Sequence, residues 1–122
     1  MNFYSDYVEN GTVYTDYEDL KKNFKIKVPE NFNFAYDIVD RYASLAPEKR
    51  ALVWCDDLGG EKIFNFKEIS EKSKQTANYL VKPGIKKGDT VMLILRRRYE
   101  FWYFILALHR IGAIAVPATN QL

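Results

Sequence analysis

The chain has 122 residues and a formal net charge of +2 at pH 7, with 48% hydrophobic and 28% charged residues. This length predicts one domain, and this composition is typical of a globular protein rather than a disordered or fibrous one. A single cysteine and a single histidine exclude a disulfide framework and a zinc site built from Cys or His pairs. The near balance of charge gives no electrostatic case for nucleic acid as a partner.

No membrane span or export signal is predicted. The longest apolar stretch, 101–108, is far shorter than the roughly 20 residues that a membrane-spanning helix needs. The first ten residues lack a basic segment followed by an apolar one, so they do not form a signal peptide. The cytoplasm is therefore the expected compartment.

Residues 1–33 are predicted to form an N-terminal arm with one short helix. Thr15 and Glu18 have the spacing of a capping box, in which Thr15 is the N-cap. The helix should run from there to about Phe24, and the segment around Pro29 should follow it as a loop.

Residues 34–122 are predicted to form the main domain, which starts with a helix and a hairpin. Apolar residues recur at helical spacing from about Phe34 to Leu45, with Asn33 as the N-cap. Two short strands, 51–55 and 62–64, flank a turn-forming cluster and predict a β-hairpin.

A third and a fourth helix follow the hairpin. Asn65 and Glu68 form a second capping box, and Pro83-Gly84 should end the helix that it starts. The apolar run 91–95 is typical of a strand covered on both faces. The nearly all-apolar segment 99–111 predicts a buried helix, and 113–116 predicts another strand. Strand, helix and strand together indicate a parallel, right-handed βαβ unit in an α/β fold.

Few catalytic patterns are present. The chain lacks both G-x-x-x-x-G-K-[ST] and G-x-G-x-x-G. His109 lies in the most apolar predicted helix and is interpreted as a satisfied structural residue, and Cys55 as a buried and inert thiol. Asp56 and Asp57 are interpreted as turn formers, and the aromatic run 101–104 as core.

The most suggestive feature is the triplet Arg96, Arg97 and Arg98. It follows the predicted central strand and precedes a helix, and ligands of open α/β sheets bind beyond the carboxyl ends of strands. Three cations there could contact phosphate or carboxylate. A solvated turn is the competing interpretation, and both remain open.

The order of several segments resembles the start of the AMP-forming acyl-CoA synthetases, in the adenylate-forming superfamily. The segments are Phe66-Lys-Glu-Ile, Gly84-Ile-Lys-Lys-Gly-Asp-Thr-Val91 and Ile111-Gly-Ala-Ile-Ala-Val-Pro117. Arg97, Glu100 and Trp102 resemble the "R-x-P-E-W-W" of the medium-chain and acetate-type branch, although Tyr99 replaces its proline and Phe101 its first tryptophan. The closing Pro117-Ala-Thr-Asn-Gln-Leu122 resembles that branch's "P-G-T-x-Q-M".

The resemblance implies an acid–thiol ligase of fatty acid metabolism and, for this chain, the N-terminal portion of its large domain. In such an enzyme a carboxylate attacks the α-phosphate of ATP, and the thiol of coenzyme A (CoA) then displaces AMP. ATP, Mg²⁺ and CoA are implied for the complete enzyme. The family's phosphate loop, Mg²⁺-binding glutamate and C-terminal lysine lie further along in such an enzyme. The resemblance therefore implies a scaffold segment that is inactive alone, with no catalytic residue and no metal ligand of its own.

Two alternatives remain open beside this one. The chain could be a stand-alone binding or assembly module, or a nucleotide-binding domain that uses Arg96–Arg98. Thr119, Asn120 and Gln121 match the family segment that approaches the CoA passage, and a simple loop is the competing interpretation. The expected partner is the remainder of the parent enzyme, or a second copy bound through the exposed sheet edge.

Overall fold

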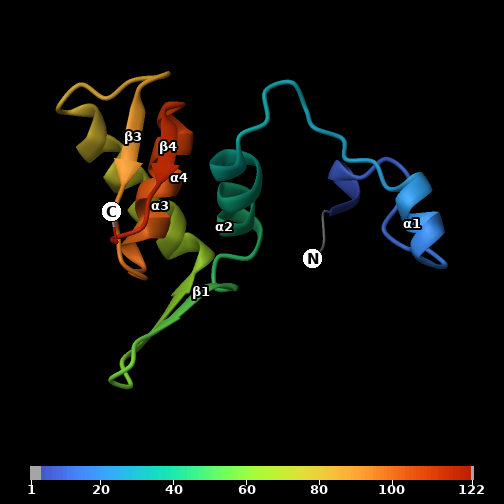
Figure 1. Cartoon of the computed structure of the whole chain (residues 1–122), viewed down its shortest axis with the longest axis horizontal. Coiled ribbons are helices and arrows are strands. Elements are labelled where there is room, and N and C mark those ends of the chain that lie inside the picture. The colour runs from blue at the N-terminus through green and yellow to red at the C-terminus, as the bar shows by residue number, and fades with distance from the viewer. Residues whose placement is uncertain (1–3, 122) are drawn as a thin grey trace. The chain divides into compact units, whose positions relative to one another are not determined.

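The computed structural model describes residues 4–121 and divides the chain into two units, Met1–Phe32 and Asn33–Leu122. The first three residues of the predicted arm and Leu122 lie outside the described residues. The elements of each unit are shown in Figure 1. In the described part of the chain they form a mixed α/β arrangement with two separate two-stranded sheets.

The first unit contains a 3₁₀ turn, η1 (Tyr4–Tyr7), and the helix α1 (Tyr17–Asn23). The helix begins one residue later than predicted, because Asp16 and not Thr15 is its N-cap and accepts a hydrogen bond from the Asp19 amide. Asp19, one residue after the predicted partner Glu18, receives hydrogen bonds from the amide and hydroxyl of Thr15. Asp16 and Asp19 therefore replace the predicted pair, Thr15 and Glu18, at the start of this helix.

The second unit begins with two helical segments in direct succession. A π-helix, η2 (Ala35–Asp40), continues into α2 (Arg41–Leu45), so the predicted helix over 34–45 is confirmed. The Asn33 side chain accepts a hydrogen bond from the Ala35 amide at 3.0 Å, as the cap prediction requires. This wide turn brings Ala35 and Val39 onto the buried side of the segment.

The hairpin joins β1 (Arg50–Cys55) to β2 (Glu61–Asn65) in antiparallel register. Asp56 forms its turn, because its carboxylate accepts hydrogen bonds from the Leu58 and Gly60 amides at 2.9 and 2.7 Å. The far end of the hairpin extends away from the helices of this unit (Figure 1).

The helix α3 (Phe66–Val81) follows directly and starts with the predicted capping box. The Asn65 side chain accepts from the Glu68 amide at 2.8 Å, and the Glu68 carboxylate accepts from the Asn65 amide at 2.9 Å. Both bonds satisfy amides that a helix start leaves without intrahelical partners.

The predicted βαβ unit is confirmed as β3 (Thr90–Leu93), α4 (Glu100–Ile111) and β4 (Ile114–Pro117), with β3 and β4 parallel. Gly112 ends α4 with φ of 78°, a left-handed conformation that favours glycine. The prediction that residues 91–95 are covered on both faces is wrong for this structure. Leu93 packs on the helices, whereas Met92 and Ile94 on the opposite face are 57% and 52% exposed.

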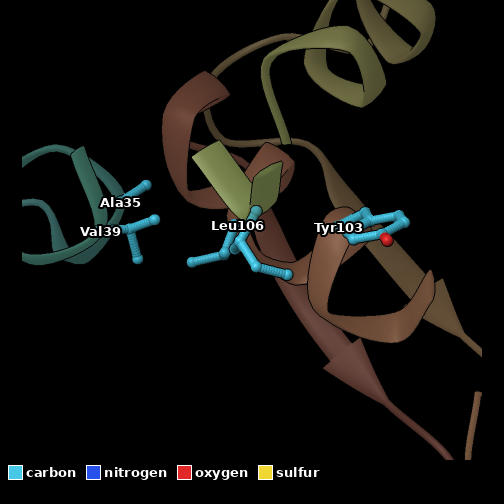
Figure 2. Close-up of a cluster of buried hydrophobic side chains, with 5 residues drawn as sticks. Ala35, Val39, Tyr103 and Leu106 are labelled. Atoms are coloured by element: carbon cyan, nitrogen blue, oxygen red, sulfur yellow. The ribbon is translucent and has the colours of Figure 1, made fainter. Parts of the chain in front are cut away.

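The core of the second unit consists of two adjoining clusters. One gathers Ala35, Val39, Ile69, Tyr103 and Leu106, and Figure 2 shows Ala35 and Val39 directed toward Leu106. The other gathers Leu80, Leu93, Ala107, Leu108 and Ala113 between α3, α4 and the parallel strands. The helix α4 contributes to both clusters, so it is the central element of the unit.

Candidate functional site

Both sets of predicted site residues lie at one edge of the parallel strand pair. Arg96–Arg98 follow β3, and Thr119–Gln121 follow β4. Parallel strands end at the same edge, and the Ala118 amide donates to the Leu93 carbonyl at 3.0 Å just beyond the last strand residues. The fold therefore brings together two segments that the sequence separates by some twenty residues.

The arginine triplet is exposed, and one member already has a partner. The Arg98 guanidinium donates two hydrogen bonds to the Glu100 carboxylate, at 3.0 and 3.2 Å. These bonds hold the pKa of Glu100 below its usual value. Glu100 lies in the first turn of α4, where its charge also suits the helix dipole, so it offsets the cost of cations beside a helix N-terminus.

Among the described residues, Arg96 and Arg97 take part in hydrogen bonds through their backbone carbonyls and not through their side chains. The Arg97 carbonyl accepts a hydrogen bond from the Trp54 indole at 2.7 Å, and the Arg98 amide donates to the Arg96 carbonyl. Within residues 4–121, no hydrogen bond or ion pair engages the guanidinium of Arg96 or Arg97. These two side chains are the ones available to an anion.

Thr119–Gln121 form an exposed turn rather than a recess. The Gln121 amide donates to the Thr119 hydroxyl at 3.2 Å, and all three side chains are exposed. A groove and a cavity on this unit are lined by other residues. Within residues 4–121, the arginine triplet and the Thr119–Gln121 turn are therefore exposed groups at this edge and do not line either hollow.

Sequence reasoning missed a largely buried polar cluster, which is centred on Arg110. Its guanidinium donates to the two carboxylate oxygens of Asp40 at 2.6 and 2.8 Å and to the Ser73 hydroxyl at 3.0 Å. The Arg110 side chain is only 4% exposed. The sequence places Asp40 on a polar helix face, whereas the structure pairs it with Arg110 across 70 residues.

The surroundings of Asp40 favour its charged form. Burial raises the pKa of this carboxyl, but hydrogen bonds from Arg110 and Ser70, together with the positive charges of Arg110 and Lys74, outweigh burial and bring the pKa below its usual value. Lys74 adds a longer contact, 3.7 Å from the carboxylate. The cluster joins η2, α3 and α4, so it fixes how the three helices pack. The sequence signal for this cluster was an arginine near the end of a mostly apolar helix.

Two predictions about reactive side chains are wrong. His109 is not satisfied: its Nδ1 is buried and has no hydrogen-bond partner in the described part of the chain, and burial lowers the pKa of the ring. Cys55 is exposed rather than buried, because it ends β1 beside the turn of the hairpin, where it pairs with Glu61. The aromatic run behaves as core at Phe101, Tyr103 and Phe104, whereas Trp102 is 48% exposed.

The described residues lack two features, a group of metal-ligating side chains and a helix able to span a membrane. Over residues 4–121, no group of three His, Cys, Asp or Glu side chains lies close enough to hold a metal ion. No helix in that range is both long and apolar enough to cross a bilayer.

Comparison with known proteins is consistent across sequence and structure. A family model described as AMP-binding enzyme matches residues 39–122. Acyl-coenzyme A synthetase ACSM3, mitochondrial, of Mus musculus is 35% identical over 115 residues, which cover 89% of this chain and 20% of that protein. The ACSM2 enzyme of Rattus norvegicus, also mitochondrial by name, is 41% identical over 102 residues, which cover 79% and 18%.

Solved structures agree with the sequence relatives. The fatty acid AMP ligase from Legionella pneumophila superposes with a TM-score of 0.65 at 25% identity, over 70% of this chain and 15% of that one. The NpsA N-terminal subdomain from Klebsiella oxytoca gives 0.62 at 29% identity, over 70% and 21%. The chain spans about a fifth of the length of the curated relatives. With the family model matching more than half of its residues, the chain belongs to the AMP-binding enzyme family.

Proposed function

We propose that this chain supplies the N-terminal scaffold segment of an acid–thiol ligase. In that reaction the carboxylate oxygen of an acid bonds to the α-phosphorus of ATP and pyrophosphate leaves. The sulfur of CoA then bonds to the acyl carbon and AMP leaves. The observation that carries the proposal is the family match over residues 39–122, together with relatives that are acyl-coenzyme A synthetases by name.

The proposed role is structural. The Arg110 cluster and the two apolar clusters give the second unit a defined packing. The exposed face of β3 and β4, formed by Met92, Ile94, Ile114 and Val116, is suited to covering layers of a larger α/β domain. We propose residues 34–122 as part of that domain, residues 1–33 as its arm, and the rest of the enzyme as the partner.

The contacts with cofactors are proposed at two places only. Arg96 and Arg97 are free to bind an anion, with Arg98 already paired, and Thr119, Asn120 and Gln121 lie at the same edge as a CoA contact. ATP, Mg²⁺ and CoA would otherwise be bound by parts of the ligase that this chain does not include, so the isolated chain should be inactive. The cytoplasm remains the predicted compartment, although the curated relatives are mitochondrial by name.

A chimaera tests the proposal. The segment of the rat ACSM2 enzyme aligned over 102 residues is replaced by the corresponding residues of this chain, and acid-dependent AMP formation is measured with ATP and CoA. Activity in the chimaera, and none in the isolated chain, supports a scaffold segment. A folded chimaera without activity would contradict it and favour a stand-alone assembly module. The same chimaera with Arg110→Leu is the matched control, and it should lose activity through misfolding.

Calorimetry of the isolated chain distinguishes the scaffold role from the remaining alternative, a nucleotide-binding domain. Mg²⁺-ATP, AMP and CoA are titrated separately into the chain. The scaffold role predicts no heat with ATP or AMP. Binding of ATP that Arg96→Gln and Arg97→Gln abolish would instead establish a nucleotide-binding domain.

A further inference from the structure

An apolar cavity of about 300 Å³ lies between η2, β1, α3 and α4. Val39, Ile69 and Leu106 form its floor, since each lines it and is only 4% exposed. Phe34 and Trp102 also line it and are 46% and 48% exposed, so they form its mouth. The cavity therefore reaches the surface at one side and the core of the unit at the other.

Among residues 4–121, no charged side chain lines the cavity. The lining is aliphatic and aromatic apart from His109, whose ring is neutral at pH 7 because burial lowers its pKa. A carboxylate or phosphate would lose its hydration there without a cation or a set of donors to replace it. The nearest arginine cluster, around Arg110, is already satisfied by Asp40 and Ser73.

We propose that this cavity binds a neutral, apolar small molecule of about the size of a substituted benzene or a short hydrocarbon. The volume of the cavity is at the lower end of the range for small-molecule pockets. A cavity of this volume is too small to hold a folded protein partner. Ligand pockets are lined mostly by hydrophobic and aromatic side chains, which stabilise an apolar molecule by removing its surface from water. None of the residues proposed for anion or CoA contact lines it, so the site is independent of the ligase proposal.

Trp102 provides the readout. The chain has two tryptophans, and only Trp102 lines the cavity. In a Trp54→Phe variant, bromobenzene in the cavity should quench Trp102 fluorescence in a saturable manner through its heavy atom. In a Trp102→Phe variant, the remaining Trp54 should show only linear, collisional quenching. The charged analogue 4-bromobenzoate should give no saturable quenching in either variant.

A filling substitution gives the matched control. Ala51→Leu, in the Trp54→Phe background, adds side-chain atoms to the cavity lining and should abolish saturable quenching. Ala118→Leu makes the same change outside the cavity and should leave it intact. Circular dichroism confirms folding, and Ile38→Phe replaces Ala51→Leu if that variant unfolds. Three results would overturn the proposal. The first is linear quenching in the Trp54→Phe protein. The others are saturable quenching that persists after the filling substitution, and saturable quenching that is equally strong with 4-bromobenzoate.

Discussion

Arg110 and Asp40 form a two-point ion pair, with nitrogen–oxygen distances of 2.6 and 2.8 Å between residues 70 positions apart. The guanidinium is almost fully buried, and the carboxylate side chain is 23% exposed. The Ser70 hydroxyl donates to the Asp40 carboxylate, and the Ser73 hydroxyl accepts from Arg110 Nε. Such a pair holds its helices in one arrangement, because any other packing would leave a buried charge without a partner.

The first prediction concerns removal of this pair. Arg110→Leu should lower the free energy of unfolding by up to about 3–5 kcal/mol, because it removes the main partner of the partly buried Asp40 carboxylate and leaves only Ser70 and the longer Lys74 contact. The double variant Asp40→Leu/Arg110→Leu should lose less than the sum of the two single variants. Urea unfolding measures each value. The exposed Arg98→Gln is the control and should change stability by about 1 kcal/mol or less. Equal losses for Arg110→Leu and Arg98→Gln would contradict a structural pair.

The second prediction follows from the lowered pKa of Asp40. Its folded-state pKa lies below the usual value of 3.8, so the unfolded state takes up the proton first as pH falls. The stability that Asp40 contributes is therefore complete above about pH 5 and is lost as pH falls through 3.8 toward the folded-state pKa. Urea unfolding between pH 6 and pH 3 should show this loss. The loss should be smaller in Asp40→Asn, and an unchanged slope in that variant would refute the assignment.

His109 gives a third prediction, in a separate pH range. Burial lowers the pKa of its ring below 6.5, so the unfolded chain binds a proton that the folded chain does not. Stability should fall as pH drops below 6.5, by at most about 1.4 kcal/mol per pH unit. His109→Gln cannot take up this proton, so its stability should stay flat between pH 7 and pH 5. A wild-type protein equally flat in that range would show that His109 titrates normally.

The fourth prediction tests the start of α3. Asn65→Ala removes the acceptor of the Glu68 amide and should cost about 1 kcal/mol of stability. Asn78→Ala, on the exposed surface of the same helix, is the matched control and should be neutral or slightly stabilising, since alanine is the better helix former. Thermal unfolding compares the two variants. A cost for Asn78→Ala as large as that for Asn65→Ala would contradict a specific capping role, because loss of either asparagine would then have the same effect.

Local patterns made the elements of the second unit predictable. The Asn65–Glu68 box and the Gly112 terminus depend on neighbouring residues, so spacing in the sequence was sufficient to locate them. The α1 cap was displaced by one position because Thr15 and Asp16 are adjacent candidate caps, and Asp19 hydrogen-bonds to both. These choices differ too little in free energy for spacing alone to decide between them.

Long-range pairing was not predictable in the same way. The partner of Arg110 lies in a helix 70 residues earlier, and only the packing of η2 on α4 brings the two together. The cavity likewise depends on four elements that meet in space. The family resemblance identified the order of segments and the family itself, whereas the predicted roles of Arg96–Arg98 and Thr119–Gln121 remain predictions.

The last prediction concerns the uncovered face of β3 and β4. Met92 and Ile114 are 57% and 54% exposed on a two-stranded sheet whose outer edges are unpaired in the described residues. The isolated chain should therefore self-associate with rising concentration, since exposed apolar strands pair readily. Met92→Lys with Ile114→Lys should shift sedimentation toward the monomer, because charge on an edge opposes pairing. Tyr79→Lys, at a position 66% exposed on α3, should not. A wild-type chain that stays monomeric at every concentration would sink the idea.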